Sequence, residues 1–254
     1  HMGVHRRPVR NQYCTYDEYA SYPLAYARSV EDLERYNKWP DPEAFEWEHF
    51  AAQIAPLHEK RFLKLHAGGI FEYAWALRGY EQFMMDLVMD PEIVHYIMDK
   101  FCTYWCTFIR RAMEAAGQYL DMVYTYDDIA AQNALLLSPD MLEEFVYPYH
   151  RRMNAVIKSY GKPIMYHSCG AVLSQLPKLA ELPIDVLNPL QPMAKGMDFR
   201  WLKDTWGDRL SFHGGICLQS TLPKGTPDEV RAAVRRAISI LGEKGGYIMT
   251  SAHY

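Results

Sequence analysis

From residue 61 onward, the chain alternates between short strand-like segments and helical segments. The strand-like segments cover residues 61–67, 121–126, 163–167, 184–188, 209–213 and 246–251, and a helical segment follows each but the last. Strands that alternate with helices predict a parallel sheet, because each helix returns the chain to the edge where the previous strand began. Two folds satisfy this pattern, an open doubly wound sheet and a (β/α)8 barrel.

Helix signals support the same division of the chain. Ser138 precedes a helix that is expected to reach about Tyr160, and Thr226 with Glu229 forms a capping box for a helix ending near Leu241. Further helices are expected over 171–181 and 198–206, and Asp90-Pro91 divides the long helical stretch that follows Gly68-Gly69. We therefore expect two parts, an irregular or helical N-terminal segment over 1–60 and a single-domain partial barrel over 61–254.

Polar residues at the ends of the strands favour the barrel over the doubly wound sheet. His66, Asp127, Asn188 and His213 each stand at the carboxyl end of a predicted strand, and no Gly-x-Gly-x-x-Gly turn follows any strand. In a barrel these ends converge on one mouth, where active sites lie. The expected fold is a truncated TIM-type barrel with about six of its eight parallel strands. Its two unpaired edges predict a homo-oligomer, or another segment that covers the gap.

Composition excludes several classes of function. The 254 residues are 49% hydrophobic and carry a formal net charge of −4, which argues against a nucleic-acid partner. No apolar run approaches the roughly 18 residues that span a bilayer, and no signal peptide is visible. The five cysteines are odd in number and irregularly spaced, as in a reducing compartment. We expect a cytoplasmic protein that binds neither membranes nor nucleic acid.

The segment from Pro163 to Gly170 points to metal chemistry. His167 and Cys169 are two residues apart at the end of a buried strand, so their side chains should face the same side. An imidazole and a thiolate together suit zinc better than magnesium or calcium. A pair of neighbouring core residues is the alternative interpretation.

Several motifs together resemble the uroporphyrinogen decarboxylase superfamily, which also contains zinc methyltransferases that work with corrinoid proteins. The motifs, in family order, are Leu77-Arg78-Gly79-Tyr80-Glu81, Tyr126-Asp127-Asp128-Ile129-Ala130, Ser138-Pro139 with Tyr147-Pro148, His167-Ser168-Cys169-Gly170, Asp185-Val186-Leu187-Asn188-Pro189, His213-Gly214-Gly215-Ile216, and Gly225-Thr226-Pro227 with Glu229-Val230. The resemblance implies a (β/α)8 barrel whose N-terminal part is missing from this chain. The His-x-Cys-Gly motif is typical of the methyltransferase branch.

The resemblance also implies a set of metal ligands. His167 and Cys169 correspond to the family's zinc ligands, and the third ligand of the family is a cysteine after the last strand. His253 stands near that position here, and imidazole is an equally good ligand for zinc. Cys217 is the alternative third ligand, although a buried free cysteine is the commoner interpretation.

Three further residues are candidates for acid, base or anchoring roles: Asp127, Asp128 and His213. With the resemblance, they predict a methyltransferase in which zinc activates a thiol or polarises the oxygen of a methyl ether or methanol. The corrinoid would reside on a partner protein, because the chain has no Asp-x-His-x-x-Gly run. The alternatives are a porphyrinogen-binding lyase, like the decarboxylase itself, and an inactive truncated barrel.

Overall fold

A six-stranded parallel sheet forms the centre of the molecule. The structure, a computed structural model, describes residues 2–253. The strands are β3 (Lys64–His66), β4 (Met122–Tyr126), β5 (Ile164–His167), β6 (Val186–Leu190), β7 (Ser211–Ile216) and β8 (Tyr247–Ser251). They lie side by side in chain order, which is the order of a barrel wall and not that of a doubly wound sheet. The wall is open, because no pairing joins β3 to β8. The predicted partial barrel is therefore confirmed.

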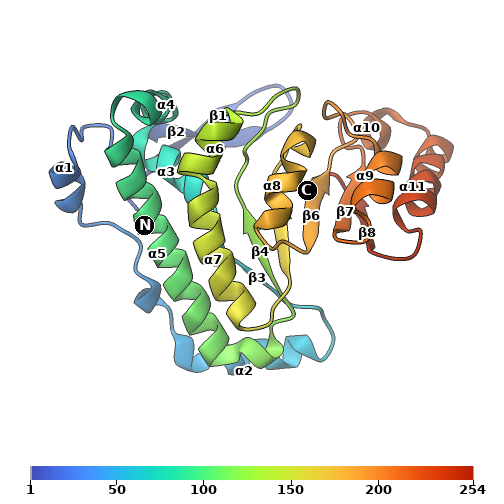
Figure 1. The fold of residues 1–254 in the computed structure, drawn as a ribbon, viewed down its shortest axis with the longest axis horizontal. Helices are drawn as coiled ribbons and strands as arrows, with labels where there is room; N and C mark the ends of the chain where they lie inside the picture. The colour runs from blue at the N-terminus through green and yellow to red at the C-terminus, as the bar shows by residue number, and fades with distance from the viewer. Residues whose placement is uncertain (1, 254) are drawn as a thin grey trace.

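Helices connect the strands and cover the sheet on its outer side (Figure 1). They are α3 (Ile70–Arg78), α4 (Tyr80–Met89), α5 (Pro91–Ala116), α6 (Pro139–Phe145), α7 (Tyr147–Ser159), α8 (Leu176–Glu181), α9 (Phe199–Trp206), α10 (Thr221–Lys224) and α11 (Pro227–Leu241). Ser138 caps α6 and the Thr226–Glu229 capping box opens α11, as predicted. The helix expected from Ser138 to Tyr160 is divided at Val146, and the helix expected over 171–181 is a short 3-10 turn (Leu173–Gln175) followed by α8.

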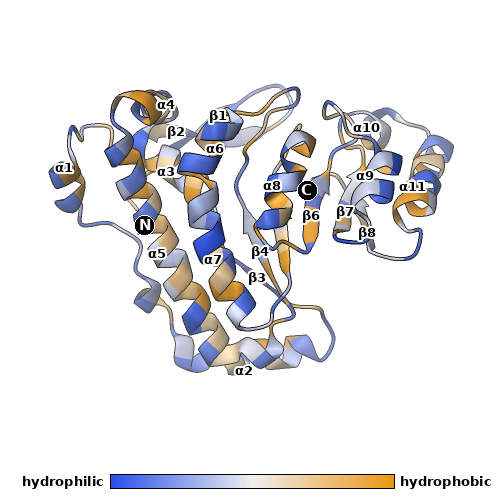
Figure 2. Ribbon diagram, viewed as in Figure 1, coloured by the Kyte–Doolittle hydropathy of each residue, from blue (hydrophilic) through white to orange (hydrophobic). Residues whose placement is uncertain are grey.

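The two faces of the sheet have different neighbours. Ile164 and Leu187 point toward the helices and are fully buried in the main core. On the opposite face, four side chains form a small apolar cluster, Met122, Tyr124, Met165 and Val186. The helices that cover the sheet accordingly carry both hydrophobic and hydrophilic residues in Figure 2. The smaller cluster forms the floor of the barrel interior.

The N-terminal segment contains a β-hairpin that was not expected from the sequence. Strands β1 (His5–Arg10) and β2 (Thr15–Ser21) pair antiparallel, and the Asn11 side chain accepts hydrogen bonds from the backbone of Tyr13 and Cys14 in the turn. Helix α1 (Val30–Glu34), a 3-10 turn (Pro42–Ala44) and α2 (Trp47–His58) follow. At the start of α1, the Ser29 side chain makes no capping hydrogen bond.

A buried arginine fastens the N-terminal segment to the barrel. Arg78 is 1% exposed and forms an ion pair with the fully buried Asp86, at 2.6 Å. Its Nη1 atom also donates hydrogen bonds to the carbonyl oxygens of Leu24 and Ala27, at 2.6 and 2.9 Å. These contacts satisfy a charge that would otherwise be costly to bury, so the segment before α1 packs firmly against α3 and α4.

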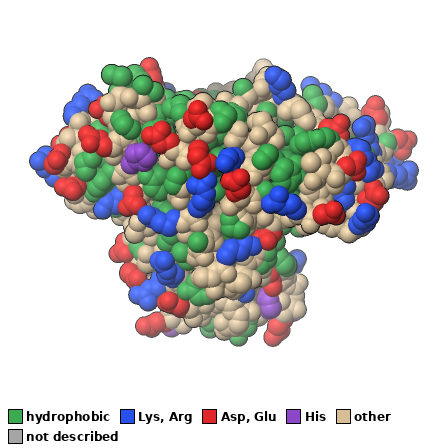
Figure 3. Space-filling model, in the orientation of Figure 1, with side chains coloured by type: hydrophobic (Ala, Val, Ile, Leu, Met, Phe, Trp, Pro, Cys, Tyr) green, Lys and Arg blue, Asp and Glu red, His purple; other side chains and the backbone are tan. Residues whose placement is uncertain are grey.

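The surface carries both signs of charge. Figure 3 shows acidic and basic side chains interspersed over one face, without a large area of a single sign. Among the described residues, no helix is long and apolar enough to cross a membrane.

Candidate functional site

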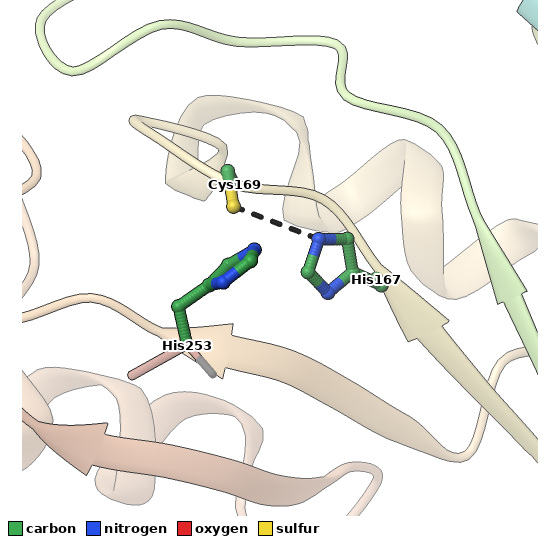
Figure 4. Close-up of side chains that lie close together, drawn as sticks. All are labelled: His167, Cys169 and His253. Carbon is green, nitrogen blue, oxygen red and sulfur yellow. Dashed lines mark hydrogen bonds between the residues drawn. The ribbon is translucent and has the colours of Figure 1, made fainter. Parts of the chain in front are cut away.

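Three potential metal ligands meet at the open mouth of the barrel. The donor atoms of His167, Cys169 and His253 all lie within 4.8 Å of one another. His167 ends β5, Cys169 follows in the next turn, and His253 follows β8, two residues beyond its end. Figure 4 shows the three side chains pointing toward a common centre. The chain thus brings together the three residues that the sequence predicted as a ligand set.

The turn after β5 places the thiol beside the imidazole. Cys169 Sγ lies 3.6 Å from His167 Nε2, so both side chains face the same side, as their spacing predicts. The Cys169 backbone N–H donates to Asp128 Oδ1 at 2.7 Å, and the Gly170 N–H donates to Gln191 Oε1 at 2.7 Å. Side chains from two neighbouring loops therefore fix the backbone of this turn.

Asn188 orients the His167 ring. The Nδ1 atom of His167 lies 2.6 Å from Asn188 Oδ1, an acceptor, so the ring proton belongs on Nδ1. This leaves the Nε2 lone pair facing Cys169. A histidine ligand commonly donates its second ring N–H to an outer partner in this way, and the partner fixes both tautomer and ring direction.

Burial keeps the His167 imidazole neutral and the thiol protonated in the absence of a cation. Burial lowers the pKa of His167, which favours the neutral form that a metal requires. Burial, together with the nearby Asp128 and Glu72 carboxylates, raises the pKa of Cys169 to about 12, although a hydrogen bond from Gln191 opposes this. A divalent cation reverses this preference, because it stabilises the thiolate directly.

The donor set fits zinc. Two imidazole nitrogens and one thiolate sulfur form a borderline-soft set, and three protein ligands leave a fourth tetrahedral position for substrate or water. Cys217, the alternative third ligand, is not part of this group. Its Sγ atom lies 3.1 Å from Ser220 Oγ, in the loop that follows β7.

The structure separates the two candidate aspartates. Asp127 is fully buried, and its carboxylate accepts hydrogen bonds from the Phe71 and Glu72 backbone N–H groups, at 3.0 and 2.8 Å. Its Oδ2 atom also lies 2.7 Å from His150 Nε2. Asp127 therefore holds the first turn of α3, which argues against the predicted catalytic role. Asp128 lies at the site, where Oδ1 is 3.7 Å from His167 Nε2 and the side chain is 41% exposed.

Two of the three ligand candidates, His167 and His253, border a cavity on the inner face of the sheet. It has a volume of about 240 Å³ and is lined by Lys64, His66, Tyr124, His167, Asn188, Pro189, His213, Thr250, Ser251 and His253. His213, the third candidate for an acid, base or anchoring role, belongs to this lining. Asn188 Nδ2 lies 2.5 Å from His213 Nδ1, so one amide contacts both His167 and His213.

Two polar residues at the site were not identified from the sequence, Lys64 and Glu72. Glu72 accepts a hydrogen bond from the Asp128 backbone N–H at 2.9 Å. Burial and the adjacent Asp127 and Asp128 raise its pKa to about 8, so a proton is available there near neutral pH. The sequence signal was its position in the first turn of the helix after β3, where acidic residues are common for purely structural reasons.

The chain is similar to known proteins in sequence pattern and in fold. The family model described as uroporphyrinogen decarboxylase (URO-D) matches residues 16–254. A methyltransferase from Methanosarcina mazei has a similar structure, with a TM-score of 0.70 at 18% sequence identity, over 94% of this chain and 67% of that protein. At this level of identity the similarity concerns the fold. No curated protein sequence matches the chain.

Proposed function

The chain belongs to the uroporphyrinogen decarboxylase family, and we propose that it is a zinc-dependent methyltransferase of this family. The methyl group would pass between a small methylated compound or a thiol and a corrinoid held by a separate protein. The solved methyltransferase from Methanosarcina mazei shares the fold, which is compatible with this proposal.

The convergence of His167, Cys169 and His253 carries the proposal. Two imidazoles and a thiol, drawn from two strand ends that are distant in sequence, have their donor atoms within 4.8 Å. A metal-free lyase site gives no reason for this set to share one point. A zinc site requires it, together with an outer hydrogen-bond partner such as Asn188.

The residues around the three ligand candidates would accept a proton from the substrate and hold the ligands in position. When bound, zinc would supply a Lewis acid that makes a thiol more acidic or polarises an ether oxygen. Asp128, half-exposed and beside His167, is placed to accept the proton that a thiol substrate loses. Asn188 holds the His167 ring in place, and Gln191 donates a hydrogen bond to Cys169 Sγ at 3.3 Å.

Porphyrinogen decarboxylation is the second candidate, and the description of the matching family favours it. A porphyrinogen carries several carboxylates, which arginines bind well through paired hydrogen bonds. Among the described residues, no arginine lines the cavity. We therefore rank this activity below methyl transfer, and a porphyrin-binding measurement distinguishes the two.

Metal analysis of purified protein tests the proposal. We expect about one zinc per chain after reconstitution, as for a three-ligand site. Cys169→Ser and His253→Ala should each lower the zinc content to a similar extent, while the matched control Cys217→Ser should retain it. Wild-type protein that binds porphyrin tightly and no zinc would favour the decarboxylase. Loss of zinc only in Cys217→Ser would show that His253 is not the third ligand.

A further inference from the structure

The cavity below the three metal-ligand candidates is lined by groups that favour negative charge. Its lining includes one ammonium group, four imidazoles, three hydroxyls and a side-chain amide, and among the described residues it includes no aspartate or glutamate. A surface rich in hydrogen-bond donors and without carboxylates favours an anionic ligand over a neutral or cationic one. The inner cavity therefore favours an anionic ligand, and the three metal-ligand candidates alone do not explain this preference.

Lys64 supplies the formal positive charge of this cavity. Lys64 and His66 are two residues apart on β3, so they share its inner face, beside Met122 and Tyr124 of β4. The Lys64 ammonium nitrogen lies 4.2 Å from the centroid of the Tyr124 ring. Among residues 2–253, the ion pairs of the structure include none with Lys64.

An anion in the cavity would stabilise the charge of the Lys64 ammonium group. Burial lowers the pKa of the Lys64 ammonium group, because the cavity solvates the charge less well than water does. The ring of Tyr124 offsets only part of this cost, since its attraction for a cation is weaker than that of a carboxylate. A ligand that brings a negative charge to Lys64 would offset the rest of this desolvation cost.

His213 supplies a directed hydrogen-bond donor. Asn188 Oδ1 accepts from His167, so the amide nitrogen of Asn188 is the atom that faces His213 Nδ1, at 2.5 Å. An amide nitrogen only donates, and His213 Nδ1 must therefore accept. The remaining proton of the neutral ring is then on Nε2. His213 can thus donate a hydrogen bond within the cavity that it lines.

We propose that the inner cavity binds the acidic group of the small-molecule substrate, with Lys64 as the counter-charge and His213 Nε2–H as a hydrogen-bond donor. The substrate would be a small carboxylic acid whose thiol or methoxy group extends toward His167, Cys169 and His253. This assignment rests on the proposed methyl transfer for the identity of the reacting group. The charge preference itself does not depend on zinc.

Paired probes that differ only in charge test this assignment. The first pair is 3-mercaptopropionate and 3-mercaptopropionamide, and the second is 4-methoxybenzoate and 4-methoxybenzamide. Binding of each is measured by calorimetry to the purified protein, whose zinc content is determined in parallel. The variants are Lys64→Met, the charge-retaining Lys64→Arg, and the matched control Lys100→Met. The Lys100 ammonium nitrogen also lies over a tyrosine ring, 5.1 Å from the centroid of Tyr96. Lys100 is on α5, however, and does not line the cavity.

We expect the wild type to bind at least one carboxylate about tenfold more tightly than its amide, as for a charge-assisted contact in a partly exposed cavity. Lys64→Met should lose this preference, and Lys64→Arg and Lys100→Met should keep it. Equal binding of acid and amide by the wild type, failure of both carboxylates to bind, or an unchanged preference in Lys64→Met would overturn the assignment. Normal zinc content with equal binding would overturn this inference alone, whereas a Lys64-dependent preference without zinc would overturn only the metal site.

Discussion

Asp127 and Asp128 are adjacent in the chain but lie in different environments. Asp127 has no exposed surface, and its two oxygens are occupied by two backbone N–H groups in the first turn of α3 and by His150. Asp128 is partly exposed at the mouth of the barrel and hydrogen-bonds to the backbone of Cys169. Adjacent strand-end residues point in opposite directions, so one carboxylate supports the fold and the other faces the three metal-ligand candidates.

This difference predicts opposite effects of two matched substitutions. Asp127→Asn should lower the free energy of unfolding by about 2–4 kcal/mol, because a buried charge-assisted network loses its anion. Asp128→Asn should change it by less than about 1 kcal/mol, since the position is partly exposed. Urea unfolding followed by circular dichroism measures both. A larger loss of stability in Asp128→Asn than in Asp127→Asn would contradict these roles.

At the level of elements, the tight turn after β5 determines the geometry of the metal-ligand candidates. Gly170 adopts φ +90°, a conformation that side chains rarely allow. A Cβ atom there would lie 2.5 Å from the Ala131 carbonyl oxygen and 2.7 Å from that of Ala130. The turn therefore packs directly against the loop after β4, and this contact holds Cys169 beside His167.

Alanine substitutions at two glycines separate backbone strain from this contact. Gly161 also has a positive φ, +68°, but no other group lies within 4 Å of the point that a Cβ atom would occupy there. Gly161→Ala should cost about 1 kcal/mol of stability from backbone strain and leave zinc binding intact. Gly170→Ala should cost about 3 kcal/mol and also weaken zinc binding, because the turn must move. Equal zinc affinity in the two variants would show that the turn does not position Cys169.

At the level of the whole molecule, the open barrel wall leaves two sheet edges without a strand partner among the described residues. The free edges are those of β3 and β8. Ile248 of β8 pairs in register with His213, so it shares the inner face, and it is 44% exposed. An uncovered edge beside an exposed apolar side chain favours pairing with another chain.

We therefore expect the chain to self-associate through the β8 edge. Light scattering across a concentration series should give a mass above that of the monomer for the wild type. Ile248→Lys should shift the protein toward the monomer, because a charged side chain next to an edge opposes pairing. The control Ile238→Lys places the same change on α11, at a similarly exposed site, and should have no effect. A wild type that stays monomeric at every concentration would contradict this expectation.

Local patterns in the sequence were sufficient for the strand-and-helix order and for one part of the site. The capping residues Ser138 and Thr226 predicted helix starts because a cap acts within three residues of itself. The proximity of His167 and Cys169 followed from the two-residue repeat of a strand, which is also local. The N-terminal hairpin was missed, since its strands lack a clear alternation of buried and exposed residues.

Long-range packing decided what the sequence left open. Only the fold brings His253 to the end of β5, turns Asp127 inward against α3, and raises the pKa of Glu72 through burial and the neighbouring carboxylates. The direction of Lys64 likewise depends on the register between β3 and β4. The sequence alone determined which residues stand at strand ends. It also determined which neighbours along a strand share a face, because side-chain direction in a strand repeats every two residues. Tertiary structure determined which of them share a cavity, because that depends on how separate strands pair and which groups become buried.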